Sequence, residues 1–173
     1  AGCTGNVYIP NIECERIDNI IKYLGARAAS DGHGVIINTD RRKELECVIS
    51  TGPFPDFPTD MQSVFLSLMA VSGSFCIMEE NVFDTRFSTA HELNGLGADI
   101  RTEGKLAYVY GRRHLHGGSV TAGDLRGGAA LVLAGLFADE PVTVNGCCYI
   151  RRGYEDLPGD LRMLGAEITA CSE

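Results

Sequence analysis

The stretch that decides the fold begins at Thr51 and reads TGPFPDFPTDMQ (51–62), SVFLSLMAVSG (63–73), SFCIMEE (74–80) and NVFDTRF (81–87). Its parts are a Gly/Pro-rich entry, an apolar segment, a short apolar run and a loop. They return in the same order as TAGDLR (121–126), GGAALVLAGLFA (127–138), PVTV (141–144) and NGCCYIRR (145–152). The chain therefore contains at least a partial internal repeat.

The two copies share charged residues as well as apolar ones. Asp60 and Asp124 each stand at the start of an apolar, helix-like run. Arg86 and Arg152 each end an aromatic-x-x-Arg group, at nearly the same distance from the preceding aspartate. Apolar periodicity alone does not place two carboxylates and two arginines in register, so the repeat predicts shared chemistry.

Apolar spacing and turn residues predict alternating helices and strands along the whole chain. Thr59 is the predicted N-cap of the helix that follows Pro58. The expected helices are 17–24, 58–72, 87–96, 124–138 and 154–164, and the expected strands are 5–10, 26–29, 35–38, 41–50, 74–79, 98–102, 106–111, 119–122, 141–144 and 167–170.

The tripeptide Leu-Gly-Ala occurs at 24–26, 96–98 and 164–166, each time after a predicted helix and before a predicted strand. Its long period does not fit a solenoid, but it fits an α/β fold of repeated βαβαββ units, in which two crossover helices lie against one sheet and a hairpin completes it. We expect one incomplete domain, with a partial first unit at 1–50, a second unit at 51–114 and a third at 115–173. A chain that starts half-way through its own repeat is expected to be a fragment of a longer protein.

Composition excludes several classes of function. The chain has 173 residues, 45% of them hydrophobic, and a net charge of −8, which argues against general binding to nucleic acids or anionic membranes. Seven scattered cysteines without a C-x-x-C pair indicate a reducing compartment. The pair His114 and His116 has no second pair to complete a metal site. No signal peptide or membrane span is predicted, so we expect a soluble, cytoplasmic protein without metal or cofactor.

The charged residues of the repeat have two interpretations each. An aspartate at a helix start, such as Asp60 or Asp124, can simply favour the positive end of the helix dipole, or it can serve a ligand in a stiff, Pro- and Gly-rich loop. A single arginine is most simply a surface or ion-paired residue. Arg86, Arg126 and Arg152, all near junctions of strands and helices, together favour a polyanionic ligand.

Four linked motifs carry a family resemblance. FPTDMQ, VFDTRF, AGDLRGGAALVLAG and RGYEDLPGDLRMLGA, in this order, resemble the C-terminal part of the UDP-N-acetylglucosamine enolpyruvyl transferases (UDP-N-acetylglucosamine 1-carboxyvinyltransferases). The resemblance runs from about Val7 to the end. It implies the enolpyruvyl-transferase fold, an inside-out α/β barrel of two domains with three units each. It also implies transfer of enolpyruvyl from phosphoenolpyruvate to the sugar 3-hydroxyl, the committed step of peptidoglycan precursor synthesis.

The resemblance also implies site residues. Asp60 in PTDMQ matches the carboxylate that contacts the sugar hydroxyl and is the candidate general base. Arg126 in DLR and Arg152 in RGYE match arginines that hold phosphoenolpyruvate. Arg86 in TRF and Asp124 match cleft residues that order the site on closure.

Val82 and Phe83 match the segment that lies along the UDP-sugar in the family. Two departures stand beside this match. Tyr149 and Arg151 occupy positions where the family usually has His and Asp. The family's N-terminal domain, with its lysine-asparagine pair and its proton-transfer loop, has no counterpart here, so none of the cysteines is nominated as catalytic.

Three functional hypotheses remain open at this point. The chain is a fragment of the transferase, or a non-catalytic module that binds a nucleotide sugar or phosphate, or one subunit of a split transferase whose partner supplies the N-terminal domain. The shikimate-3-phosphate enolpyruvyl transferases share the fold, but their terminal patterns are not found in this sequence. RNA 3′-phosphate cyclases, more distant in architecture, require a basic surface.

Two structural expectations follow from the repeat. The helices that begin near Asp60 and Asp124 are expected to be the most buried. Asp60, Arg86, Arg126 and Arg152 are expected on one face at the ends of elements. In the absence of substrate, the free domain is expected either to hold an anion there or to pair the arginines with Asp60 and Asp124.

Overall fold

The architecture comes from a computed structural model that describes residues 6–13, 17–38, 48–84 and 86–171. The unit at the centre of the chain has the order β-α-β-α-β-β. Its elements are β4 (Val48–Ser50), α2 (Gln62–Ala70), β5 (Phe75–Glu79), α3 (Ser88–Gly95), β6 (Ile100–Glu103) and β7 (Leu106–Tyr110).

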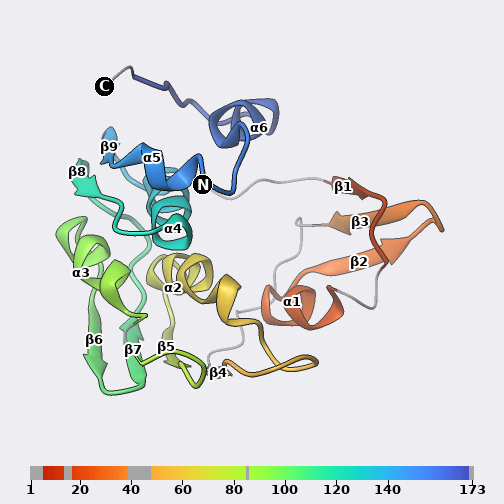
Figure 1. Ribbon diagram of the computed structural model, residues 1–173, viewed down its shortest axis with the longest axis horizontal. Coiled ribbons are helices and arrows are strands. Elements are labelled where there is room, and N and C mark those ends of the chain that lie inside the picture. The colour runs from red at the N-terminus through yellow and green to blue at the C-terminus, as the bar shows by residue number, and fades with distance from the viewer. Residues whose placement is uncertain (1–5, 14–16, 39–47, 85, 172–173) are drawn as a thin grey trace.

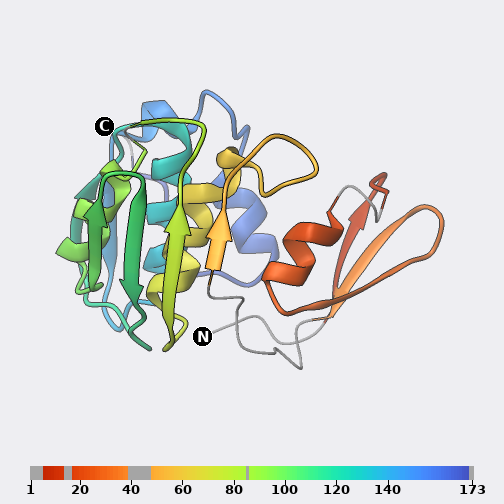
Figure 2. The same ribbon diagram turned by 90° about the horizontal axis from the view of Figure 1, so that it is seen from below.

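This unit forms one four-stranded sheet in the order β4-β5-β7-β6. β4 and β5 are parallel, as a crossover through α2 requires, and β7 is antiparallel to both β5 and β6. Figure 2 shows α2 and α3 on the same side of this sheet. The predicted βαβαββ unit is therefore confirmed.

The rest of the chain repeats parts of this unit. The preceding part contains β1 (Asn6–Pro10), α1 (Asp18–Tyr23), β2 (Arg27–Ser30) and β3 (Gly34–Asn38), and the following part contains β8 (Gly118–Thr121), α4 (Leu125–Gly135), β9 (Val142–Asn145), α5 (Cys147–Ile150) and α6 (Leu157–Met163). The order β1-β3-β2 reproduces β5-β7-β6, and the parallel pair β8-β9 reproduces β4-β5.

The glycine of each Leu-Gly-Ala tripeptide has the conformation that its position after a helix requires. Gly25, Gly97 and Gly165 follow α1, α3 and α6 with φ of 62°, 87° and 93°. A residue with a Cβ is strained at these angles, and a left-handed glycine is a common way to end a helix. The tripeptide thus marks equivalent points of the three units.

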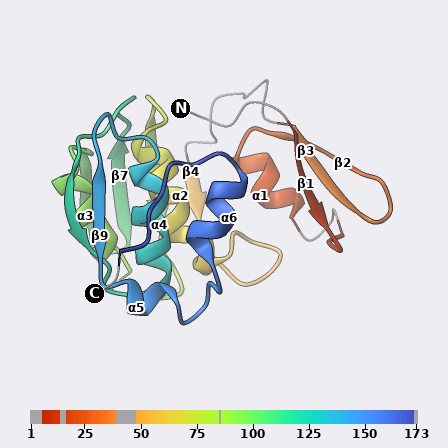
Figure 3. The ribbon, with the colours of Figure 1, turned by 90° about the horizontal axis from the view of Figure 1, so that it is seen from above.

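The core lies between the central sheet and the helices α2 and α4 (Figure 1). Figure 3 shows α4 between β9 and α2. Phe65, Leu66 and Met69 of α2 are buried, and the Ser67 hydroxyl donates to the carbonyl of Ala130 on α4 at 2.9 Å. The two helices predicted to be the most buried contain more buried residues than α3 or α6, which confirms that expectation.

The start of α2 differs from the prediction. Thr59–Met61 forms a 3-10 turn, η2, and α2 begins only at Gln62. The Thr59 hydroxyl makes no capping hydrogen bond; it donates to the carboxylate of Glu80 at 2.9 Å and accepts from Nη1 of Arg86 at 2.9 Å. The prediction of Thr59 as N-cap was therefore wrong.

The C-terminal part also differs. The predicted helix 154–164 begins later, with the Asp156 side chain accepting a hydrogen bond from the Gly159 amide. The predicted strand at 167–170 is absent from the described residues, and the amide of Ala166 bonds back to Leu161 at the end of α6. Of the predicted strand 41–50, only Val48–Ser50 lies within the described residues, and it is a strand.

Candidate active site

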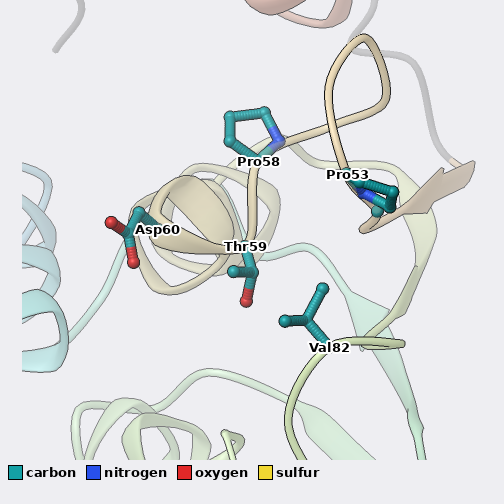
Figure 4. A pocket seen from close by; sticks show the side chains of 6 residues that line it. Pro53, Pro58, Thr59, Asp60 and Val82 are labelled. Carbon is teal, nitrogen blue, oxygen red and sulfur yellow. The ribbon is translucent and has the colours of Figure 1, made fainter.

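The candidate site lies where β4 and β5 end and α2 begins. An open cavity of about 350 Å³ is lined by Gly52, Pro53, Pro58, Thr59, Asp60 and Val82. Loops at the carboxyl ends of parallel strands form the usual ligand sites of α/β sheets. Figure 4 shows the Thr59 side chain pointing toward Val82, while the Asp60 carboxylate points to the other side of the turn.

Asp60 joins two arginines from distant parts of the sequence. One carboxylate oxygen lies 3.3 Å from Nη1 of Arg86, and the other lies 3.1 Å from Nη2 of Arg126. The side chain of Asp60 is 56% exposed, whereas Arg86 is 24% and Arg126 32% exposed. The carboxylate is therefore open to solvent between two more buried cations.

Arg86 is fixed by more than its ion pair. Its Nη1 also donates to the carbonyl and to the hydroxyl of Thr59, both at 2.9 Å. The guanidinium carbon lies 4.5 Å from the centre of the Phe83 ring, within the range of a cation–π contact. The loop that contains Val82 and Phe83 is thereby joined to the start of η2.

Arg126, in the first turn of α4, has a second partner in Tyr154. Its Nη1 donates to the Tyr154 hydroxyl at 3.3 Å. This hydrogen bond raises the pKa of Arg126, the charge of Asp60 raises it further, and partial burial acts in the opposite direction. The guanidinium is therefore a permanent cation at this site.

Asp124 does not pair with any described arginine, so the pairing expected as one alternative for the free protein is found for Asp60 and not for Asp124. Its Oδ1 accepts a hydrogen bond from the Gly127 amide at 2.7 Å, so it is the N-cap of α4. An N-cap aspartate satisfies an amide that the helix itself leaves unpaired. Of the two interpretations of Asp124, its contacts agree with that of an aspartate that stabilises a helix start.

Arg152 is exposed in the turn after α5. Among the described residues, its side chain has no hydrogen-bond or ion-pair partner. The turn lies beside the start of α4, because a Cβ added at Gly153 would lie 2.7 Å from Leu125. Of the four residues predicted to converge, Asp60, Arg86 and Arg126 are thus in contact, and Arg152 is not in contact with them.

Two residues of this region were missed by the sequence prediction. Glu80, only 1% exposed, directly follows β5 and continues the alternation of its buried residues Cys76 and Met78, so the period-two pattern places all three on the inner side. The pattern could have identified it. Tyr154 stands in the quoted motif RGYE, but nothing local in the sequence predicts its contact with Arg126.

Within the described ranges, no helix is long and apolar enough to cross a membrane. The same residues contain no group of three or more His, Cys, Asp or Glu arranged to hold a metal ion. His114 instead bonds Asp139, with Nδ1 3.0 Å from the carboxylate.

The chain is similar to several curated proteins named UDP-N-acetylglucosamine 1-carboxyvinyltransferase. The protein from Wolbachia pipientis subsp. Culex pipiens is 40% identical over 166 residues, which cover 96% of this chain and 39% of the relative. The protein from Desulfofundulus thermocisternus is 48% identical over 120 residues, covering 69% of this chain and 49% of the relative. The chain thus spans less than half of the length of these relatives.

Solved structures show the same fold. The enolpyruvyl transferase NikO from Streptomyces tendae matches with a TM-score of 0.75 and 28% identity, over 88% of this chain and 35% of that one. The EPSP synthase of Acinetobacter baumannii matches with a TM-score of 0.65 and 16% identity, over 82% of this chain and 35% of that one.

The family model described as EPSP synthase (3-phosphoshikimate 1-carboxyvinyltransferase) matches residues 3–161. Sequence motifs, repeated units and these matches agree, and the chain belongs to the EPSP synthase family of enolpyruvyl transferases.

Proposed function

We propose that this chain supplies one side of the active-site cleft of an enolpyruvyl transferase that acts on UDP-N-acetylglucosamine. The observation that carries the proposal is the Asp60 carboxylate, held between Arg86 and Arg126 at the edge of an open cavity. The names of the relatives support the choice of acceptor. In this proposal residues 1–173 are one incomplete domain of three units, close to the expected ranges 1–50, 51–114 and 115–173, except that the second unit already includes β4 (Val48–Ser50).

Asp60 is the proposed general base. In the reaction the oxygen of the sugar 3-hydroxyl adds to C2 of phosphoenolpyruvate while C3 takes up a proton from the opposite side of the cleft. Loss of a proton from C3 then restores the double bond as the bond between C2 and the phosphate oxygen breaks. The hydroxyl proton passes to Asp60, and phosphate leaves with the electron pair of the broken bond. Asp60 suits this role because its carboxylate is the most exposed member of the cluster and is therefore within reach of a sugar hydroxyl.

The arginines are the proposed anion site. Phosphoenolpyruvate carries a phosphate and a carboxylate, and the planar guanidinium group suits both. We assign Arg126 and Arg152 to phosphoenolpyruvate, and Arg86 to ordering of the site. An incoming anion competes with Asp60 for the guanidinium groups, so that binding of one substrate frees the base for the other.

The remaining assignments concern the walls of the cleft. Val82 lines the cavity, and Phe83 lies against Arg86, so we place both along the UDP-sugar. Asp124 holds the first turn of α4, from which Arg126 extends. Through this cap Asp124 orders the anion site without contacting the anion.

The isolated chain is proposed to be inactive, because a site that acts as a unit loses most of its rate when part of it is removed. The chain covers 39 to 49% of the first three relatives. We propose that an N-terminal domain, in cis or in trans, supplies the opposite side of the cleft. The two substrates are soluble phosphorylated metabolites, so we place the reaction in the cytoplasm.

The test measures phosphate release from phosphoenolpyruvate in the presence of UDP-N-acetylglucosamine, for the chain alone and joined to the N-terminal domain of a relative. We expect turnover only from the joined protein, and a loss of roughly 10²-fold or more in Asp60→Asn, as is typical for removal of a general base. The matched control is Asp99→Asn, because Asp99 also pairs with two arginines, Arg101 and Arg112, away from the cavity. Turnover by the chain alone, or an Asp60→Asn variant as active as the control, would contradict the proposal.

A further inference from the structure

Glu80 is a buried acid that the proposed reaction does not use. Its carboxylate, at the end of β5, accepts four hydrogen bonds. Oε1 accepts from the Thr51 hydroxyl at 3.0 Å and from the amides of Val82 and Phe83 at 2.8 and 3.1 Å, and Oε2 accepts from the Thr59 hydroxyl at 2.9 Å. Buried carboxylates are tolerated where such donors replace water.

These donors come from three segments that surround the cavity. Thr51 begins the entry loop, Thr59 begins η2, and Val82 with Phe83 forms the opposite loop. One carboxylate therefore holds both walls of the cavity at a fixed separation.

The Thr59 hydroxyl connects Glu80 to the charged cluster. It donates its single proton to Glu80 and accepts a hydrogen bond from Nη1 of Arg86, which in turn lies 3.3 Å from Asp60. The direction of each bond is fixed, because a carboxylate only accepts and a guanidinium only donates. Glu80 thus sets the orientation of the Thr59 hydroxyl, which accepts the hydrogen bond from Arg86.

We propose that Glu80 is a positioning residue for the anion site. It contacts no substrate, but it fixes the direction of the Arg86 guanidinium through Thr59 and the position of the Val82–Phe83 loop through two amides. This inference rests on the proposed function, because it presumes that Arg126 and Arg152 bind an anion and that Arg86 orders this site.

The test uses Glu80→Gln, which keeps the shape of the side chain but replaces one accepting oxygen with a donor. The matched control is Glu79→Gln. Glu79 is the neighbouring residue of β5, and its carboxylate accepts from the Ser50 hydroxyl at 2.8 Å. Both variants lose one negative charge, and only the first changes the contacts of Thr59, Val82 and Phe83.

Inorganic phosphate is titrated into the ¹⁵N-labelled 173-residue chain, well below its unfolding temperature, and the amide signals of Val82 and Phe83 are followed by NMR. We expect the dissociation constant to rise about tenfold in Glu80→Gln, since small displacements of binding groups are costly. Loss of a nearby negative charge alone strengthens anion binding, so charge and positioning predict opposite signs. Glu79→Gln is expected to bind phosphate at least as well as the unaltered chain.

A purely structural role predicts a lower unfolding temperature with unchanged or tighter phosphate binding, and that result overturns the inference. Thr59→Val provides a second variant that leaves Glu80 three of its donors. We expect it to weaken phosphate binding as Glu80→Gln does, and Thr59→Ser, which keeps the hydroxyl, to restore it. Equal binding by the valine and serine variants refutes the connection. Absence of phosphate binding in the unaltered chain refutes the anion site itself, and with it this inference.

Discussion

Replacement of Arg126 by alanine removes a cation with two partners, Asp60 at 3.1 Å and Tyr154 at 3.3 Å. In the substrate complex the same guanidinium is proposed to bind an anion. Removal of one donor of such a charge-assisted hydrogen bond costs about 2–4 kcal/mol of transition-state stabilisation. At about 1.4 kcal/mol for each factor of ten, kcat/KM of the joined protein falls roughly 30- to 1000-fold.

The same substitution has little effect on stability. The pair of Arg126 with Asp60 is partly exposed, with 32% and 56% of the two side chains accessible, and exposed pairs contribute about 0–1 kcal/mol to the free energy of unfolding. A large loss of activity without a matching loss of stability therefore distinguishes a binding role from a structural one. Lysine at this position is expected to restore only part of the activity, because it lacks the planar fork.

The assay combines steady-state phosphate release with urea unfolding of the same preparations. Arg112→Ala is the control, since Arg112 also forms an ion pair, 3.1 Å from Asp99, on the hairpin side of the molecule. Unchanged kcat/KM in Arg126→Ala, an equal loss in Arg112→Ala, or a loss explained by unfolding would refute the assignment of Arg126.

Three further predictions concern single sites. Asp124→Ala is expected to cost about 0.5–2 kcal/mol of stability in urea unfolding, and Asp124→Asn much less, because asparagine also caps helices; equal costs would contradict the cap. Gly128→Ala is expected to destabilise by about 1–3 kcal/mol through overpacking, since its Cβ would lie 2.7 Å from a neighbouring side chain, whereas Gly95→Ala, which meets open space, should stabilise by about 0.4–1 kcal/mol. The hydrogen bond with Tyr154 raises the pKa of Arg126. The positive charge of Arg126 therefore stabilises the fold fully below the unfolded-state pKa, and this stabilisation is lost only as pH rises through the higher folded-state pKa. The affinity for sulfate should accordingly show no decrease caused by Arg126 between about pH 6 and 9.

The repeat was predictable because its signals are local. The apolar stripe of 61–69 and the glycines at 25, 97 and 165 each report on a few neighbouring residues, and helix periodicity and left-handed turns depend mainly on such neighbours. The family motifs predicted which residues meet at the site, and the side chains of Asp60, Arg86 and Arg126 are in contact.

The errors lie where long-range contacts decide the structure. Thr59 has the residue type and position of an N-cap, but its hydroxyl is hydrogen-bonded to the buried carboxylate of Glu80 instead. The sequence at 167–170 has strand-forming residues, but a strand also needs a partner edge, and none of the described strands pairs with it. Asp124 and Asp60 occupy equivalent helix starts, yet only Asp60 faces two arginines, because α2 and α4 pack side by side and bring Arg126 to it.

The most direct test of the central claim compares two acceptors. The joined protein is incubated with phosphoenolpyruvate and either UDP-N-acetylglucosamine or shikimate 3-phosphate, and released phosphate is measured. We predict phosphate release that depends on UDP-N-acetylglucosamine and none above background with shikimate 3-phosphate. Phosphate release with shikimate 3-phosphate and not with UDP-N-acetylglucosamine would contradict the account, and so would a joined protein that releases phosphate with neither of the two acceptors.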